Sequence, residues 1–191
     1  MKKLLEQPTL SFVEFIERLN LPPKFDFKPL KIVFDRYGIE IKNSILRGSN
    51  LALTTIYKKV HFNISKLNLL IDYKHINCDD LFFLIAHELC HYIRINKYGL
   101  DFHLTKLTTK DLEEFSTYLV TEEIICDRFS KLFFYNSKGF MYNGPFNRNL
   151  KEVSEYELYK KNLFFTYEKF LEYNFDYNKI INDYFIVIKR D

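Results

Sequence analysis

The stretch His87-Glu88-Leu89-Cys90-His91 determines how the rest of this chain is interpreted. Residues four apart on an α-helix lie on the same face, so His87 and His91 can direct their imidazoles at one metal ion. Glu88 lies one helical step round, where it can reach a water molecule on that metal. Zinc lowers the pKa of bound water from about 15.7 to about 7, so a neighbouring carboxylate can accept its proton. This H-E-x-x-H pattern is typical of zinc metalloproteases.

The residues around the motif predict a buried helix over about 79–97. Asn77 and the acidic residues after it suit a helix N-terminus, and Gly99 suits the end. The segment is apolar nearly all round, which indicates burial. Polar side chains in a buried helix need partners, and a metal ion would supply them. The alternative is a chance match with hydrogen-bonded core histidines, which is weak because the chain has only 5 His.

A catalytic zinc ion usually has three protein ligands and one open position, so a third ligand is expected downstream. The candidates are Asp101, His103, Glu113, Glu114, Glu122, Glu123 and Asp127. Most of them fall in a second predicted helix, from Thr108 to about Tyr135. Thr108 and Asp111 resemble a capping box at its start.

Glu123 and Asp127 are four residues apart and lie close to one apolar stripe of this second helix. Glu123 is therefore the favoured third ligand. Asp127, one turn on, can accept the outer ring N–H of a ligating histidine and fix its orientation. Two alternatives stay open. Glu122 lies near another apolar stripe and could be the ligand, and Asp127 could be a surface charge paired with Arg128 or Lys131.

The two motifs together resemble the ImmA/IrrE metallopeptidases. The first is H-E-L-C-H at 87–91, and the second, about thirty residues later, is Glu123-x-x-Cys126-Asp127-Arg128-Phe129-Ser130. The resemblance covers roughly residues 25–140. It implies a minimal, gluzincin-type zinc-protease fold and one zinc ion per chain on His87, His91 and Glu123. Two departures are Ser130 in place of a small Ala, and Leu132-Phe-Phe-Tyr135 in place of Leu-Met-Pro.

The resemblance also implies a function, namely endopeptidase cleavage of a regulatory protein. The typical substrate is a helix-turn-helix repressor of a phage, mobile element or stress response. Glu88 would act as the catalytic base. A transition-state helper, commonly a His or Tyr, is expected, and Tyr98, His103 and Tyr142 are the open candidates. The alternative function is a catalytically silent protein of this fold that sequesters a regulatory partner, although the intact Glu88 favours the enzyme.

Composition bounds these hypotheses. The chain has 191 residues and is 47% hydrophobic, which suits one domain with a sizeable core. The net charge of +3, with scattered Lys and Arg, gives no support for direct nucleic-acid binding. Cys78, Cys90 and Cys126 are odd in number and form no CxxC pair, which fits free thiols in a reducing compartment. Cys90 is about 100° from the histidine face and is predicted to be core.

Nothing in the sequence predicts export or membrane insertion. Residues 1–5 begin like a signal peptide, but Glu6 to Pro8 interrupt it before an apolar core forms. No run approaches the roughly 18 apolar residues of a membrane span. The sequence therefore predicts a cytoplasmic protein with no membrane partner, from a bacterium or a mobile element within one.

The predicted architecture is α+β, with a small, mostly antiparallel sheet packed on the buried zinc-binding helix and further helices. Its parts are N-terminal helices at 1–38, the sheet at 39–73, the zinc-site helices at 79–135 and a C-terminal extension at 136–191. Within the sheet region a hairpin-like turn at 47–50 joins strands at 45–46 and 51–57, and a further strand covers 67–73. An edge strand beside the metal could pair with an extended substrate backbone.

The C-terminal extension begins with a predicted loop at 136–149, which is placed to hang over the site. Residues 151–173 are predicted to be helical. Residues 176–190 are predicted to form either a helix or a terminal strand.

Overall fold

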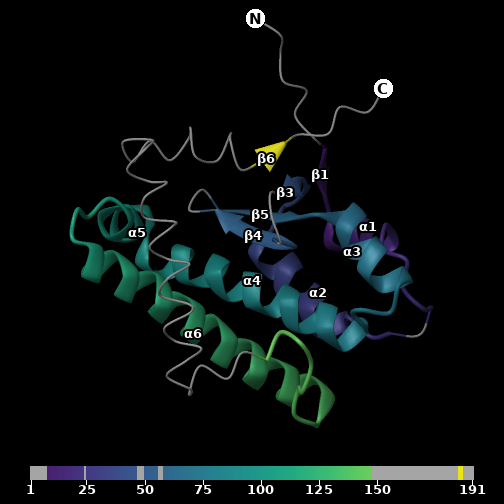
Figure 1. The fold of residues 1–191 in the computed structure, drawn as a ribbon. Helices are drawn as coiled ribbons and strands as arrows, with labels where there is room; N and C mark the ends of the chain where they lie inside the picture. The colour runs from purple at the N-terminus through teal and green to yellow at the C-terminus, as the bar shows by residue number, and fades with distance from the viewer. Residues whose placement is uncertain (1–7, 24, 47–49, 56–57, 148–184, 187–191) are drawn as a thin grey trace, which may run out of the picture.

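The chain folds as an α+β structure, with a small sheet on one side of a pair of long helices (Figure 1). The computed structural model describes residues 8–23, 25–46, 50–55, 58–147 and 185–186. The described helices are α1 (Phe12–Glu17), α2 (Lys28–Tyr37), α3 (Ile64–Asp72), α4 (Cys78–Tyr98), α5 (Leu100–Leu107) and α6 (Leu112–Lys138). The described strands are β1 (Thr9–Leu10), β2 (Ile41–Asn43), β3 (Ile45–Leu46), β4 (Ala52–Thr55), β5 (Lys59–Phe62) and β6 (Phe185–Ile186).

Four of the strands form one sheet in the order β1-β2-β5-β4. β1 pairs with β2 and β4 pairs with β5 in antiparallel fashion, whereas β2 and β5 are parallel. The expected small, mostly antiparallel sheet is therefore present. β4 is an edge strand of this sheet and packs against α4. A separate pair joins β3 to β6.

Helix α4 forms where the sequence predicts it. The Asn77 side chain accepts hydrogen bonds from the backbone N–H of Asp79 and Asp80, at 2.8 and 3.0 Å. The Asp80 carboxylate accepts the Asn77 N–H at 2.8 Å and completes a capping box. Gly99, at φ 82°, ends the helix. Most of α4 is buried, including His87 and Glu88.

The second long helix, α6, starts later than predicted because Thr108 belongs to the preceding turn. Thr108 Oγ1 donates to the carbonyl of Leu104 at 2.7 Å and closes α5, a helix that the sequence did not predict. Asp111 is the N-cap of α6, and its side chain accepts the Glu114 N–H at 2.9 Å. The helix runs to Lys138 and packs along α4. These two helices carry the predicted metal ligands.

The predicted strand over 67–73 is wrong, because residues 67–72 belong to α3 and Tyr73 is its C-cap. Asn63 caps that helix by accepting the Lys66 N–H at 3.1 Å, and Ile64 and Leu67 are buried at helical spacing. The predicted pairing of 45–46 with 51–57 is also wrong. β4 pairs with β5, and β3 pairs with β6. Short apolar runs fit either period, and the sequence does not encode which strand is the neighbour.

Residues 9–17, which form β1 and α1, pack on the sheet. Ser11 caps α1 in a capping box with Glu14, and Gly38, at φ 59°, ends α2. Phe15 of α1 stacks on Phe62 of β5, with ring centroids 4.5 Å apart, so the sheet and the helices share one core. β1, which lies just before the Ser11 cap, was not predicted.

The C-terminal predictions are tested only in part. The predicted loop at 136–149 begins too early, because residues 136–138 still belong to α6. Residues 140–147 form no helix or strand, as expected for a loop. The predicted helix over 151–173 lies outside the described residues, and β6 falls within the range 176–190. None of the helices that the structure describes combines the length and apolar character needed to cross a membrane.

Candidate metal centre

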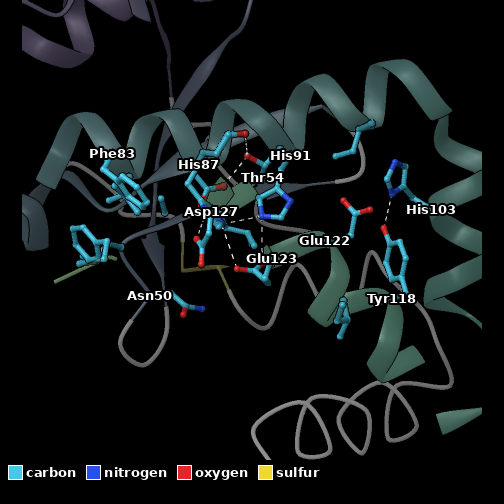
Figure 2. A pocket seen from close by; sticks show the side chains of 18 of the residues that line it. Asn50, Thr54, Phe83, His87, His91, His103, Tyr118, Glu122, Glu123 and Asp127 are labelled. Atoms are coloured by element: carbon cyan, nitrogen blue, oxygen red, sulfur yellow. Dashed lines mark hydrogen bonds and ion pairs between the residues drawn. The ribbon is translucent and has the colours of Figure 1, made fainter. Parts of the chain in front are cut away.

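Three donor atoms from α4 and α6 converge at one point (Figure 2). The Nε2 atoms of His87 and His91 are 3.1 Å apart. Glu123 faces both rings, with Oε2 3.3 Å from Nε2 of His87 and Oε1 3.3 Å from Nε2 of His91. The histidines lie one turn apart on α4, and the carboxylate reaches them from α6.

These separations fit a metal ion. Ligand atoms about 2.0 Å from a tetrahedral centre such as zinc lie about 3.3 Å from one another. The three measured separations, 3.1, 3.3 and 3.3 Å, agree with that value. His87, His91 and Glu123 could therefore hold a metal ion, as expected. Three protein ligands leave the fourth position of a tetrahedron open, as catalytic sites require.

Asp127 fixes the orientation of His87. Its Oδ1 lies 2.9 Å from Nδ1 of His87, so the ring donates its Nδ1–H to the carboxylate and points its Nε2 lone pair at the other ligand atoms. Asp127 is only 3% exposed. The alternative, a solvated surface charge, does not fit this burial.

The carboxylates of Glu123 and Asp127 stabilise positive charge at the two histidines. Burial by itself would lower the pKa of His87, but hydrogen bonds to Asp127 and Glu123 raise the pKa to about 10. Burial would also lower the pKa of His91, but its hydrogen bond to Glu123 and the charge of that carboxylate raise it above its ordinary value. Burial would raise the pKa of Glu123, yet the two imidazoles hold it well below its usual range. A divalent cation would take the place of these protons.

Glu122, the alternative third ligand, points elsewhere. Arg94 of α4 donates from Nε to Glu122 Oε2 at 2.7 Å and from Nη2 to Oε1. This hydrogen-bonded pair raises the pKa of Arg94 further above its ordinary value. Both side chains are largely buried between α4 and α6. Glu122 therefore neutralises an arginine, and Glu123 is the carboxylate that meets the histidines.

Glu88 is held by a residue that the sequence analysis missed. Thr54 of β4 lies with Oγ1 2.7 Å from Glu88 Oε2 and 3.0 Å from the Glu88 carbonyl oxygen, and its hydroxyl can donate to either. Glu88 itself is 6% exposed. Nothing in the sequence marks Thr54 out from the adjacent Thr55. Only the packing of β4 on α4 shows which of the two threonines contacts Glu88.

The cluster lies in the middle of a cleft of about 620 Å³. β4 and the residues before it form one wall, since Asn50 through Thr54 all line it. Figure 2 shows Phe83 and Asn50 at one end, and His103 and Tyr118 at the other. The remaining lining residues are Leu84, Ile95, Leu107, Leu119, Pro145 and Phe146, together with Glu122 and the cluster residues. The predicted loop after α6 thus reaches the cleft.

Of the three helper candidates, only His103 lines the cleft. Its Nδ1 is hydrogen-bonded to the Tyr118 hydroxyl, and burial lowers its pKa, which favours a neutral ring. Tyr98 is 44% exposed, packs against Phe102 and is not among the lining residues. Tyr142 is buried and is likewise not among them. The structure therefore does not bring Tyr98 or Tyr142 to the metal ligands.

Cys90 is a core residue, as expected. It is 4% exposed, and Cys126 on the facing helix is fully buried. The two thiols hydrogen-bond to each other across the contact between α4 and α6. Cys90 is not among the residues that converge on the metal position.

No protein-family model matches this chain, and no curated protein or solved structure shows significant similarity to it.

Proposed function

We propose that this protein is a zinc-dependent peptidase. The observation that carries the proposal is the convergence of His87, His91 and Glu123 in a cleft that also holds the Glu88 carboxylate. This donor set, two imidazoles and a carboxylate with an open fourth position, is one that catalytic zinc uses. The same residues carry the resemblance to the ImmA/IrrE metallopeptidases.

The proposed chemistry assigns one task to each side chain. Zinc, when bound, supplies a Lewis acid that polarises the peptide carbonyl and acidifies water. Glu88 accepts a proton from the attacking water and delivers it to the leaving amine. Thr54 holds one Glu88 oxygen by a 2.7 Å hydrogen bond, which keeps the carboxylate in one rotamer. Asp127 holds His87 through its outer ring nitrogen.

The shape of the cleft supports a peptide substrate. It follows α4 from Phe83 to Ile95, a rise of about 18 Å at roughly 1.5 Å per residue. An extended peptide of about five residues, at roughly 3.3 Å each, has the same length. β4 runs along the wall as an edge strand, so an extended peptide can pair with its backbone.

Incubation with a protein substrate tests the proposal directly. The substrate that the family resemblance favours is a small helix-turn-helix repressor encoded beside this chain. We expect the zinc-loaded protein to cut it, a chelator to stop the cleavage and added zinc to restore it, with mass spectrometry locating the new termini. Stoichiometric binding without cleavage would favour the alternative function, sequestration of the partner.

Replacing each of the two adjacent glutamates in turn should show which of them binds the metal. Glu123→Gln should weaken zinc binding by more than the roughly 10–100-fold cost of losing an outer-shell partner. Glu122→Gln should retain zinc but lower the free energy of unfolding by about 1–3 kcal/mol, because it weakens charged hydrogen bonds to Arg94. Competition with a chromophoric chelator measures the first effect and urea unfolding the second. Equal loss of zinc from both variants would contradict the assignment.

Asp127→Asn should keep the metal ligands in place and lower zinc affinity or activity by about 10–100-fold. The amide removes the negative charge that now favours the Nδ1–H tautomer of His87. Asp101→Asn, at an exposed position of α5, is the matched control. A zinc dissociation constant and an activity unchanged from wild type would show that the contact has no effect on the metal.

Substitution of Thr54 should lower kcat and leave the amount of bound zinc unchanged. Thr54→Val keeps the shape of the side chain but cannot donate to Glu88. We expect kcat to fall by about tenfold or more, because a hydrogen bond to a charged group contributes about 1.5–3 kcal/mol and about 1.4 kcal/mol is a factor of ten in rate. Thr54→Ser should restore most of the activity. Initial rates on zinc-saturated protein measure both. If Val and Ser lower kcat equally, the loss comes from packing on α4 and not from the hydrogen bond.

A further inference from the structure

The end of the cleft beside Phe83 is built by the segment that follows α6. Tyr142 in this segment is 4% exposed, and its ring stacks on Phe83 with centroids 4.2 Å apart. Its hydroxyl donates to Asp80 Oδ1 at 2.7 Å. Asp80 is also the residue that closes the capping box of α4. The segment is therefore fastened to the first turn of the helix that carries the metal ligands.

The same hydroxyl fixes the backbone of the residues that line the cleft. It accepts the Phe146 N–H at 3.2 Å, and the Asn147 side chain donates to the Tyr142 carbonyl at 3.3 Å. The chain wraps so closely here that a Cβ at Gly144 would clash with Asp80 Oδ1 and with the Tyr142 hydroxyl oxygen. A side chain at position 144 would therefore require Asp80, Tyr142 or the segment itself to shift. Pro145 and Phe146 are thus held in a defined place on the cleft wall.

The chemistry of this end is mainly apolar. Besides Pro145 and Phe146, the cleft lining includes Leu51 and Leu84, and the uncharged Asn50 lies at the same end as Phe83 (Figure 2). The charged lining residues belong to the metal cluster or to the Glu122 pair with Arg94. A substrate side chain placed here would meet carbon atoms on several sides and would find no opposite charge.

We propose that Phe146, at the end of the cleft where the buried Phe83 lies, forms a subsite that selects a large apolar side chain of the substrate, and that Tyr142 is the positioning residue that holds Phe146 there. The inference rests on the proposed peptidase function, which it deepens by naming a substrate preference. A segment that offers a leucine or phenylalanine in extended form is usually buried in a folded protein. Suitable substrates are therefore protein segments exposed by partial unfolding or by loss of a partner.

A panel of fluorogenic peptides, each with one position changed among Leu, Phe, Ala and Asp, tests the subsite. At one position the enzyme should favour Leu or Phe over Ala by at least about tenfold in kcat/KM. This is the effect expected when the substrate side chain that fills an apolar pocket loses methylene groups. Phe146→Ala should reduce that ratio at least threefold at this position and leave the other positions unchanged. Phe140→Ala, on an exposed residue of the same segment, is the control. A ratio unaffected by Phe146→Ala would overturn the assignment.

Tyr142→Phe tests the positioning role, because it keeps the ring on Phe83 but removes the hydroxyl. The preference for Leu over Ala should weaken through a higher KM for the Leu peptide, more than through a lower kcat. A preference that stays at the wild-type value would show that the hydroxyl does not position Phe146. Thermal unfolding of the variant, measured in parallel, shows whether the segment is still folded.

A binding measurement separates this inference from the proposed function. Zinc-loaded Glu88→Gln protein, with fluorescein-labelled peptides of the same panel, reports affinity without turnover. If the wild type cuts nothing, the peptidase proposal fails, and tighter binding of Leu peptides that depends on Phe146 would still support the subsite. If binding shows no such dependence, the subsite inference fails, whatever the wild type cuts.

Discussion

Glu88→Gln should lower peptide hydrolysis by about 10²–10⁴-fold, the usual contribution of a catalytic base. Glutamine keeps the shape of the side chain and can still accept the hydrogen bond from Thr54, but it cannot take a proton from water. Glu88 is not one of the three converging ligands, so bound zinc should stay at the wild-type level. Initial rates and metal analysis on the same preparation measure the two quantities together.

The same variant separates an enzyme from a sequestering protein. Wild type and Glu88→Gln can each be co-expressed with the repressor-like neighbour, while the length of the repressor and transcription of its target are followed. A peptidase gives a shortened repressor and active transcription only with the wild type. Equal relief of repression by both forms, with the repressor intact, would mean that the chain acts by binding.

His87→Ala should abolish stoichiometric zinc binding and also destabilise the fold. It removes a proposed metal ligand and breaks the 2.9 Å contact between the imidazole and the buried Asp127 carboxylate. Breaking a buried charged pair from one side costs about 3–5 kcal/mol. His91→Ala should lose zinc as well but cost less stability, because His91 is more exposed and its ring faces Glu123 and not Asp127.

Urea unfolding in the presence of chelator isolates the stability effect, and metal analysis isolates the zinc effect. His75→Ala, at an exposed position outside the cleft, should change neither quantity and is the matched control. Full zinc occupancy in either His87→Ala or His91→Ala would refute the metal centre. A His87→Ala variant as stable as His91→Ala would show that the Asp127 contact contributes little to folding.

The sequence predicted α4 well because its signals are local. The Asn77 cap, the acidic first turn and Gly99 bracket an apolar segment, and all of them act within a few residues of the helix. The relation between His87 and His91 follows from helical geometry alone. These features need no knowledge of what packs against the helix.

Predictions failed or stayed open where a distant residue decides the outcome. Glu122 and Glu123 both lie near apolar stripes, and only the position of Arg94 on α4 shows which carboxylate is taken up by an arginine. Thr54 is chosen over Thr55 by the packing of β4 against α4. Tyr142 was one of three open candidates for a catalytic helper, because tyrosines can serve that role, but its hydroxyl is hydrogen-bonded to Asp80.

The three donor residues of the candidate metal centre come from two helices, and α5 lies between them in the chain. A chain emerging from the ribosome presents His87 and His91 well before Glu123, and α4 alone holds only two of the three donors. The third arrives when α6 docks on α4, which also buries Asp127 behind His87. If the protein is the peptidase that we propose, its site is incomplete while the chain is being synthesised, when its own unfolded segments would be the nearest substrates. Completion of the fold is then the step that switches on the chemistry.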